Sequence, residues 1–285
     1  MISAETIDEL QNEEQYLKIQ YASRLYYNRA EIINYLSWTL CLMSSLMVFL
    51  PDNTVKIITI CSPLVLDGAA LIAIWVFNKM LKNAADLRAF FDAQVLMINA
   101  ETYSEIDKRR LLELSEYIFE KKRAEAEESF RNTGEKIPPG VRNWYVFKNP
   151  VDGLEAQFEC QRQNIWWNKK MVRKRQAVLF VVSLLMIALF IISLINFSSS
   201  RLSIISCYAG IALKLIERGI EHKNYYDASL KIEAIQEHIE SHLTMDGIQK
   251  LQNLINERRR IPVLEINLMH KKNAKKLSST YRSIS

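Results

Sequence analysis

Three long apolar runs and a shorter fourth run dominate the pattern of hydrophobic and polar positions along the chain. Residues 32–50 and 177–197 contain no charged side chain, and residues 57–77 contain only Asp67. Each of these runs reaches the roughly 20 helical residues that a hydrocarbon core requires. The fourth run, 202–213, spans only if Lys214 at its end extends its amine toward the headgroups. The pattern therefore predicts four transmembrane helices.

The connections within each pair of runs, 51–54 and 198–201, are very short and predict two hairpins. At the helix ends that adjoin these loops, the basic residues are Lys56 and Arg201. The opposite ends of the helices are strongly basic, with Arg24, Arg29, Lys79, Lys82, Lys169, Lys170, Arg173, Lys174, Arg175, Arg218 and Lys223. Because lysine and arginine are retained on the cytoplasmic side, both termini and the central segment are expected in the cytoplasm. Acidic residues precede the first apolar run, unlike a cleaved signal peptide, so this helix is expected to remain as an anchor.

Apolar residues at helical spacing continue beyond the runs. Leu87, Phe91, Val95 and Ile98 predict that the second helix extends to about residue 100 as a stalk, roughly 50 Å long at 1.5 Å per residue. The expected regions are an N-terminal amphipathic helix (1–31), a first transmembrane hairpin (32–81), a central cytoplasmic helical region (82–176) with a helix at 107–131, a second hairpin (177–216), C-terminal helices (217–260) and a basic tail (261–285).

Composition supports a helical protein and excludes several other classes. The 7 glycines and 6 prolines are too few for the frequent turns of β-sandwiches and barrels, and neither common glycine-rich phosphate loop is present. The chain is therefore expected to be an all-α membrane protein with four transmembrane helices in two short-looped hairpins and long helical cytoplasmic extensions. The basic tail is expected either to be solvated or to rest on anionic lipid.

Asp67 is the candidate functional residue of the membrane region. An ionised carboxylate at the middle of a membrane helix costs at least ~2.5–3.5 kcal/mol, so an interaction should offset it. At the helical rise, Asp67 and Lys214 lie roughly 15 and 18 Å from the outer loops. We hypothesise that the two residues pair within the bundle or line a water-filled path. The alternative is a protonated Asp67 that only helps the helices to pack.

A second group of candidate residues lies in the central region and combines planar cations, amides and aromatic rings. Such side chains bind phosphates and stack on bases, so the group predicts a nucleotide-binding surface. Its members are Arg142, Asn143, Trp144, Tyr145, Arg162 and Asn164. Trp166 and Trp167 precede the third apolar run beside basic residues, where an aromatic belt at the membrane interface is expected instead.

Metal-binding and catalytic patterns are not met. His238 and His242 are four residues apart, but the zincin motif is missing and no third ligand is placed. No set of serine, cysteine and histidine residues resembles a catalytic triad. The four cysteines suggest neither a disulfide framework nor a metal pair, and they are expected to be small packing residues. We therefore expect no catalytic residue, no metal and no resident cofactor.

The order of segments and the stretch 149–175 resemble the SMODS-associated four-transmembrane effector family of bacteria. This stretch contains an Asn-Pro pair and, from residue 160, the sequence Cys-Gln-Arg-Gln-Asn-Ile-Trp-Trp-Asn. The resemblance implies the killing arm of an antiphage system, in which a nucleotidyltransferase makes a cyclic oligonucleotide and the effector disrupts the inner membrane. It implies a lipid bilayer as partner and a cyclic oligonucleotide as activating ligand, with no nucleic acid polymer.

Four helices in one chain leave no aqueous path, so a pore or lesion is expected to need a homo-oligomer. The leading expectation is a ligand-triggered effector in the bacterial inner membrane. One alternative is an inner-membrane scaffold whose cytoplasmic helices recruit a partner, and another is a constitutive channel.

Overall fold

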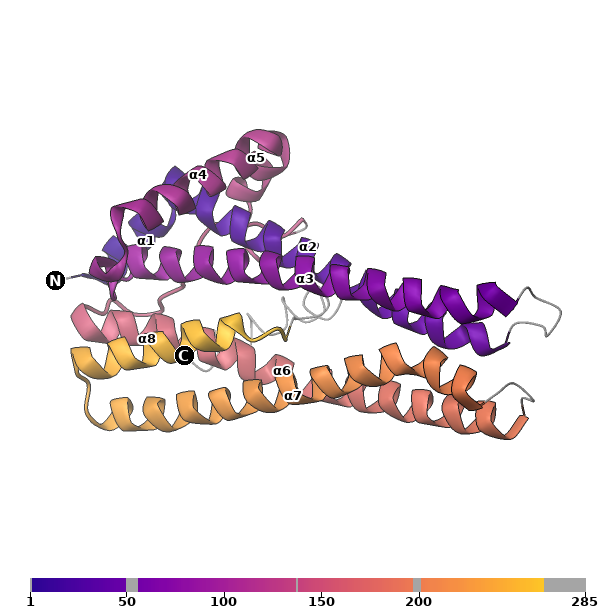
Figure 1. Ribbon diagram of the computed structural model, residues 1–285. Coiled ribbons are helices and arrows are strands. Elements are labelled where there is room, and N and C mark those ends of the chain that lie inside the picture. The colour runs from indigo at the N-terminus through magenta and orange to yellow at the C-terminus, as the bar shows by residue number, and fades with distance from the viewer. Residues whose placement is uncertain (1, 50–55, 137, 197–200, 264–285) are drawn as a thin grey trace.

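Four long helices form the frame of the protein in a computed structural model that describes residues 2–49, 56–136, 138–196 and 201–263. They are α2 (Glu14–Leu46), α3 (Lys56–Val95), α6 (Gly153–Asn196) and α7 (Arg201–Ser241). Figure 1 shows all four extending to one end of the molecule in two pairs, α2 with α3 and α6 with α7. The predicted loop 51–54, residues 198–200 of the predicted loop 198–201, the tail from residue 264, and the side chains of 56–60, 168–179, 196 and 201–203 lie outside the described residues. Arg201, predicted in the second loop, is the first residue of α7.

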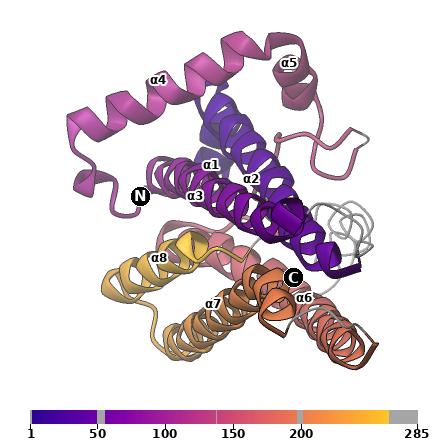
Figure 2. The ribbon, with the colours of Figure 1, turned by 45° about the vertical axis from the view of Figure 1, so that its right-hand side comes forward.

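Shorter helices surround the other end of the frame. They are α1 (Ala4–Gln11), α4 (Glu105–Lys121), α5 (Arg123–Arg131) and α8 (Met245–Arg260), with 3-10 turns η1 (Met47–Phe49) and η2 (Ala100–Thr102). Figures 1 and 2 show α4 and α5 on one side of α3 and α8 on the other. No strand occurs in the part of the chain that the structure describes, which confirms the all-helical prediction.

Side-chain caps and one local break set the limits of the short helices. The hydroxyl oxygens of Ser3, Ser104 and Thr244 each accept a hydrogen bond from a backbone N–H in the first turn of their helix. Such a cap contributes about 1 kcal/mol to the stability of the helix. The helix predicted at 107–131 is divided into α4 and α5, because Lys122 leaves helical geometry with φ −135° and ψ 32°. The sequence gives no strong breaker at this point.

The long helices continue well beyond the apolar runs, toward the end of the molecule that carries the shorter helices (Figure 1). Most of the first run lies in the second half of α2. Because α2 begins at Glu14, its first half contains most of the predicted N-terminal helix. The third run lies in α6, which begins at Gly153 because no proline or glycine interrupts residues 154–196. The stretch that carries Arg162, Asn164 and the tryptophan pair is therefore helical.

Two of the long helices have the properties of membrane spans. Glu14–Phe49 and Cys61–Val95 are long and apolar enough to cross a bilayer, and only 28% and 22% of their most apolar windows are buried. A core helix of a soluble protein is mostly buried, whereas Leu64, Leu71 and Trp75 of α3 are 76%, 67% and 65% exposed. In α6 the described apolar stretch, Phe180–Ile195, is shorter.

Buried residues form three clusters along the frame. The largest packs α1, α4 and α8 against the ends of the long helices that lie away from the apolar runs, and it includes the predicted stalk residues Leu87, Phe91, Val95 and Ile98. A small cluster around Phe77 and Leu81 follows, and a third joins all four long helices near their outer ends. Cys41, Cys160 and Cys207 are buried in these clusters as expected for packing residues, whereas Cys61 is exposed.

Candidate functional site

A buried carboxylate, Asp92 of α3, lies in the region of the largest buried cluster, which we call the main core. Its side chain is fully enclosed and accepts three hydrogen bonds. The hydroxyl of Tyr145 donates to Oδ1 at 2.7 Å, while Arg259 Nη1 and Gln252 Nε2 donate to Oδ2 at 2.7 and 3.1 Å. Because Arg259 and Gln252 belong to α8, this cluster fastens α8 and the segment before α6 to α3.

Tyr145 is the best-enclosed member of the predicted nucleotide-binding group. Its backbone N–H donates to Gln11 Oε1 at 2.7 Å, and its carbonyl accepts from Gln11 Nε2 at 3.0 Å. Asn164 Nδ2 donates to the Tyr145 hydroxyl at 3.0 Å, so the structure brings these two predicted residues together. Burial and then the nearby Asp92 charge raise the pKa of Tyr145 well above its usual value, which keeps the hydroxyl protonated as a donor.

The other predicted binding residues lie around this core at different exposures. The guanidinium carbon of Arg88 lies 3.8 Å from the ring centroid of Trp144, which is half-buried. Asn143 is exposed, and its side-chain oxygen and backbone N–H bond to Asn12 at 2.9 and 3.1 Å. Arg142 is exposed. These residues form a continuous segment, but Tyr145 within it already has internal partners.

Arg162 and the tryptophan pair lie on α6. Arg162 Nη2 pairs with Glu159 one turn earlier at 2.7 Å, and both side chains are partly exposed. Trp166 and Trp167 are half-buried and meet edge to face with centroids 6.0 Å apart. Their place in an aromatic belt stays a prediction.

Removal of the Tyr145 hydroxyl is expected to destabilise the folded protein. Tyr145→Phe leaves Asp92 and Asn164 without one partner each, and an unsatisfied buried polar group costs about 1–3 kcal/mol. Urea unfolding of the purified protein in detergent measures the change. Tyr117→Phe on α4 is the matched control, because Tyr117 is 60% exposed. Equal stability of both variants would contradict the structural role of this hydroxyl.

The structure places Asp67 against α7, where the two pairs of long helices meet. A Cβ at Gly210 would lie 2.2 Å from Asp67 Oδ1 and 2.4 Å from its Cγ, so the carboxyl occupies the space of a missing side chain. Asp67 Oδ1 is buried and has no hydrogen-bond partner. Ser44 on α2 also has a buried hydroxyl oxygen without a partner. Asp67 thus lies at a helix contact within the apolar arm.

Lys214 does not pair with Asp67 in the structure. Its side chain is only 2% exposed, its Nζ donates to Ser37 Oγ at 2.5 Å, and it lies 5.3 Å from the ring centroid of Trp38. Lys214 follows Gly210 by four residues, about 6 Å along the helix, which separates its amine from the carboxyl beside Gly210. Asp67 and Lys214 therefore lie at similar depths but form no ion pair, because Asp67 contacts α7 and Lys214 contacts α2.

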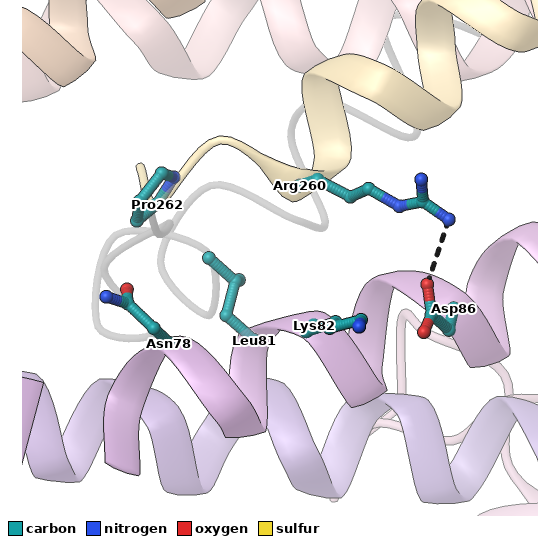
Figure 3. A pocket seen from close by; sticks show the side chains of 6 residues that line it. All are labelled: Asn78, Leu81, Lys82, Asp86, Arg260 and Pro262. Atoms are coloured by element: carbon teal, nitrogen blue, oxygen red, sulfur yellow. Dashed lines mark hydrogen bonds and ion pairs between the residues drawn. The ribbon is translucent and has the colours of Figure 1, made fainter. Parts of the chain in front are cut away.

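A cavity of about 450 Å³ opens between α3 and the end of α8. Figure 3 shows Asn78, Leu81, Lys82 and Asp86 of α3 on one wall, with Arg260 and Pro262 on the other. Asn78 directly follows the second apolar run, so the cavity lies at the boundary between the apolar arm and the main core.

Sequence reasoning missed Asp92, Arg259 and the cavity. The available signals were an aspartate inside the apolar stretch 89–96 and the run Arg258-Arg259-Arg260 at the end of a predicted helix. Neither signal identifies its partner, since residues 92 and 259 are far apart in the chain. Among the described residues no group of three His, Cys, Asp or Glu side chains could hold a metal ion.

The chain matches the model of one family of domains, whereas no curated protein and no solved structure matches it significantly. The description of the family names an effector domain rather than a class of enzyme. The family model covers residues 5–264, almost the whole chain. As the resemblance of the sequence implied, the protein belongs to the SMODS-associating 4TM effector domain family.

Proposed function

We propose that the protein is a ligand-triggered, membrane-disrupting or pore-forming effector of a bacterial antiphage system that uses a nucleotide second messenger. Its activity would arrest or kill the infected cell. Family membership supports an effector role in signalling or defence, and the exposed apolar arms support a site of action in a membrane. In this proposal the trigger is a cyclic oligonucleotide.

The observation that carries the proposal is the continuity of α3. This single helix of 40 residues holds Asp67 in the apolar arm and Asp92 in the main core. At 1.5 Å per residue it is about 60 Å long. A ligand that binds one arrangement of the cytoplasmic helices better than another shifts the protein toward that arrangement. A displacement of the core is then transmitted along α3 to the membrane arm.

In the proposed topology all four long helices span the bacterial inner membrane and both termini are cytoplasmic. The distribution of lysine and arginine supports this orientation. One chain packs its four helices against each other through a buried cluster, which leaves no aqueous path. Disruption of the membrane therefore requires several copies, so the active form is proposed to be a homo-oligomer.

The direct test is dye release from liposomes that contain the purified full-length protein. A panel of cyclic dinucleotides and trinucleotides is added, and we expect one member to release the dye. The same messenger should arrest growth when the protein is co-expressed with the nucleotidyltransferase that makes it. If no messenger releases dye and no such co-expression is toxic, the proposal is wrong and a scaffold role is favoured.

Asp67→Asn is expected to reduce ligand-triggered dye release while the protein still inserts and folds. The substitution keeps the shape of a side chain in contact with α7 but removes a carboxylate that is costly in a membrane and hence expected to serve function. Asp227→Asn, an exposed position further along α7, is the control and should release dye normally. Equal release by both variants would leave Asp67 with a packing role only.

A further inference from the structure

The cavity between α3 and the end of α8 has an excess of positive charge. Its lining contains one acidic residue, Asp86, which contacts Arg260 Nη2 at 3.1 Å and Arg110 Nη2 at 3.7 Å. Lys82 also lines the cavity, and no ion pair of its amine occurs among the described residues. Asp86 is therefore already neutralised, and Lys82 remains to attract an anion.

A buried arginine lies directly behind Pro262 in the cavity wall. Arg218 of α7 is only 6% exposed, and its Nη1 donates to the Pro262 carbonyl at 2.7 Å. Its guanidinium carbon lies 4.9 Å from the ring centroid of Phe77, the residue before Asn78 of the lining. Arg218 therefore connects the second pair of long helices to the same boundary at which the cavity opens.

The guanidinium of Arg218 is incompletely satisfied. Its Nε and Nη2 are buried without a hydrogen-bond partner. Its acidic neighbour is Glu221, whose Oε2 lies 2.6 Å from Nη1, and burial raises the pKa of Glu221 to about 7. At neutral pH Glu221 therefore carries only part of its charge. A buried positive charge that is only partly balanced is costly, and an anion held nearby would offset part of this cost.

We propose that this cavity binds a phosphate-bearing anion through Lys82 and Arg260, with the positive charge of Arg218, which holds Pro262 of the wall, adding to the attraction. The volume of about 450 Å³ is in the range of small-molecule sites. Guanidinium and ammonium groups are the usual partners of phosphate, and their charge-assisted hydrogen bonds are strong. The phosphate belongs either to a soluble nucleotide or to the headgroup of an inner-leaflet lipid.

Because of the position of the site, a bound ligand would affect how the long helices pack. Its lining comes from α3 and the end of α8, and Arg218 of α7 hydrogen-bonds to Pro262 in its wall, so a ligand there lies where both pairs of long helices meet the helix fastened to Asp92. This step rests on the proposed function, because it identifies the site at which a trigger or a lipid would act. The binding itself is measured without any assay of leakage.

The test uses the full-length protein in nanodiscs of neutral phosphatidylcholine. Inorganic pyrophosphate and cyclic di-AMP are titrated by calorimetry, and a second set of nanodiscs contains phosphatidylglycerol, with the shift in unfolding midpoint as readout. Binding of a soluble probe identifies a free phosphate ligand, and stabilisation only by phosphatidylglycerol identifies a headgroup. The absence of both effects overturns the proposal.

Matched variants locate the binding. Lys82→Gln should weaken it by about tenfold, as expected for one lost charge-assisted contact, and Arg218→Gln should weaken it less, because Arg218 acts on the ligand through its charge and its bond to Pro262. Lys79→Gln is the control, because Lys79 is exposed on the same helix, lies over Trp75 and does not line the cavity. Equal effects of Lys82→Gln and Lys79→Gln would overturn the assignment. Binding at this site in a protein that no messenger of the panel activates, in liposomes or in cells, would instead refute the proposed function alone.

Discussion

Gly210→Ala is expected to destabilise the contact between the two pairs of long helices by about 1–3 kcal/mol, the usual effect of an overpacked core. The added Cβ would lie 2.2 Å from Asp67 Oδ1 and 2.4 Å from Asp67 Cγ, so either the carboxyl or the helix must move. The carboxyl has little freedom, because it ends a short side chain and its Oδ1 is buried. Thermal unfolding of the purified protein in detergent micelles measures the loss.

Two further variants separate this contact from the general effect of a substituted glycine. Gly219→Ala lies on the same helix with nothing within 4 Å of its Cβ, so it should be neutral or stabilising by up to about 1 kcal/mol. In the double variant Asp67→Ala with Gly210→Ala the clash disappears, and most of the lost stability should return. Simple additivity of the two single effects would contradict a direct contact between residues 67 and 210.

The contact of Asp67 with Gly210 also shows what the sequence predicts in the membrane arm. The apolar run identifies Asp67 as an exceptional residue, and counting residues gives its depth. Depth does not give the rotation of each helix about its axis, and Lys214 in the structure contacts Ser37 of α2 instead. A glycine on the partner helix, which admits the carboxyl, is recognisable only once the helices are placed side by side.

In the main core the periodicity was a better guide to apolar residues than to polar ones. It predicted Leu87, Phe91 and Val95 on one face of α3, and all three are fully buried. An amphipathic helix with one apolar face would leave Asp92 solvated. The structure covers a second face of α3 with α8, which is far away in the chain, and therefore buries Asp92 as well. Single-sequence periodicity contains no information about this long-range packing.

Asp92→Ala is expected to be the most destabilising single substitution in the main core, with a loss of about 3–5 kcal/mol in the free energy of unfolding. It leaves Arg259, whose side chain is 11% exposed, without its counter-charge, and it removes the acceptor of Tyr145 and Gln252. Because these donors fasten α8 to α3, limited proteolysis should cleave α8 earlier than in the unmodified protein. Urea unfolding measures the loss of stability.

An exposed ion pair on α8 supplies the control for this prediction. Asp246 pairs with Lys250 at 2.7 Å, but their side chains are 73% and 64% exposed, so Asp246→Ala should change stability by less than about 1 kcal/mol. A comparable loss in both variants would mean that the Asp92 cluster is not a buried anchor.

Replacement of both Asp92 and Arg259 tests why Asp92→Ala lowers the stability. Asp92→Leu combined with Arg259→Met removes the buried charges together, and such exchanges of a buried pair for apolar side chains are often neutral. The double variant should therefore be more stable than Asp92→Ala. If it is not, the hydrogen bonds of Tyr145 and Gln252, rather than the unpaired charge of Arg259, determine the stability of the cluster. In either case the stability of this cluster sets how firmly α8, which supplies Arg260 to the cavity wall, is held against α3.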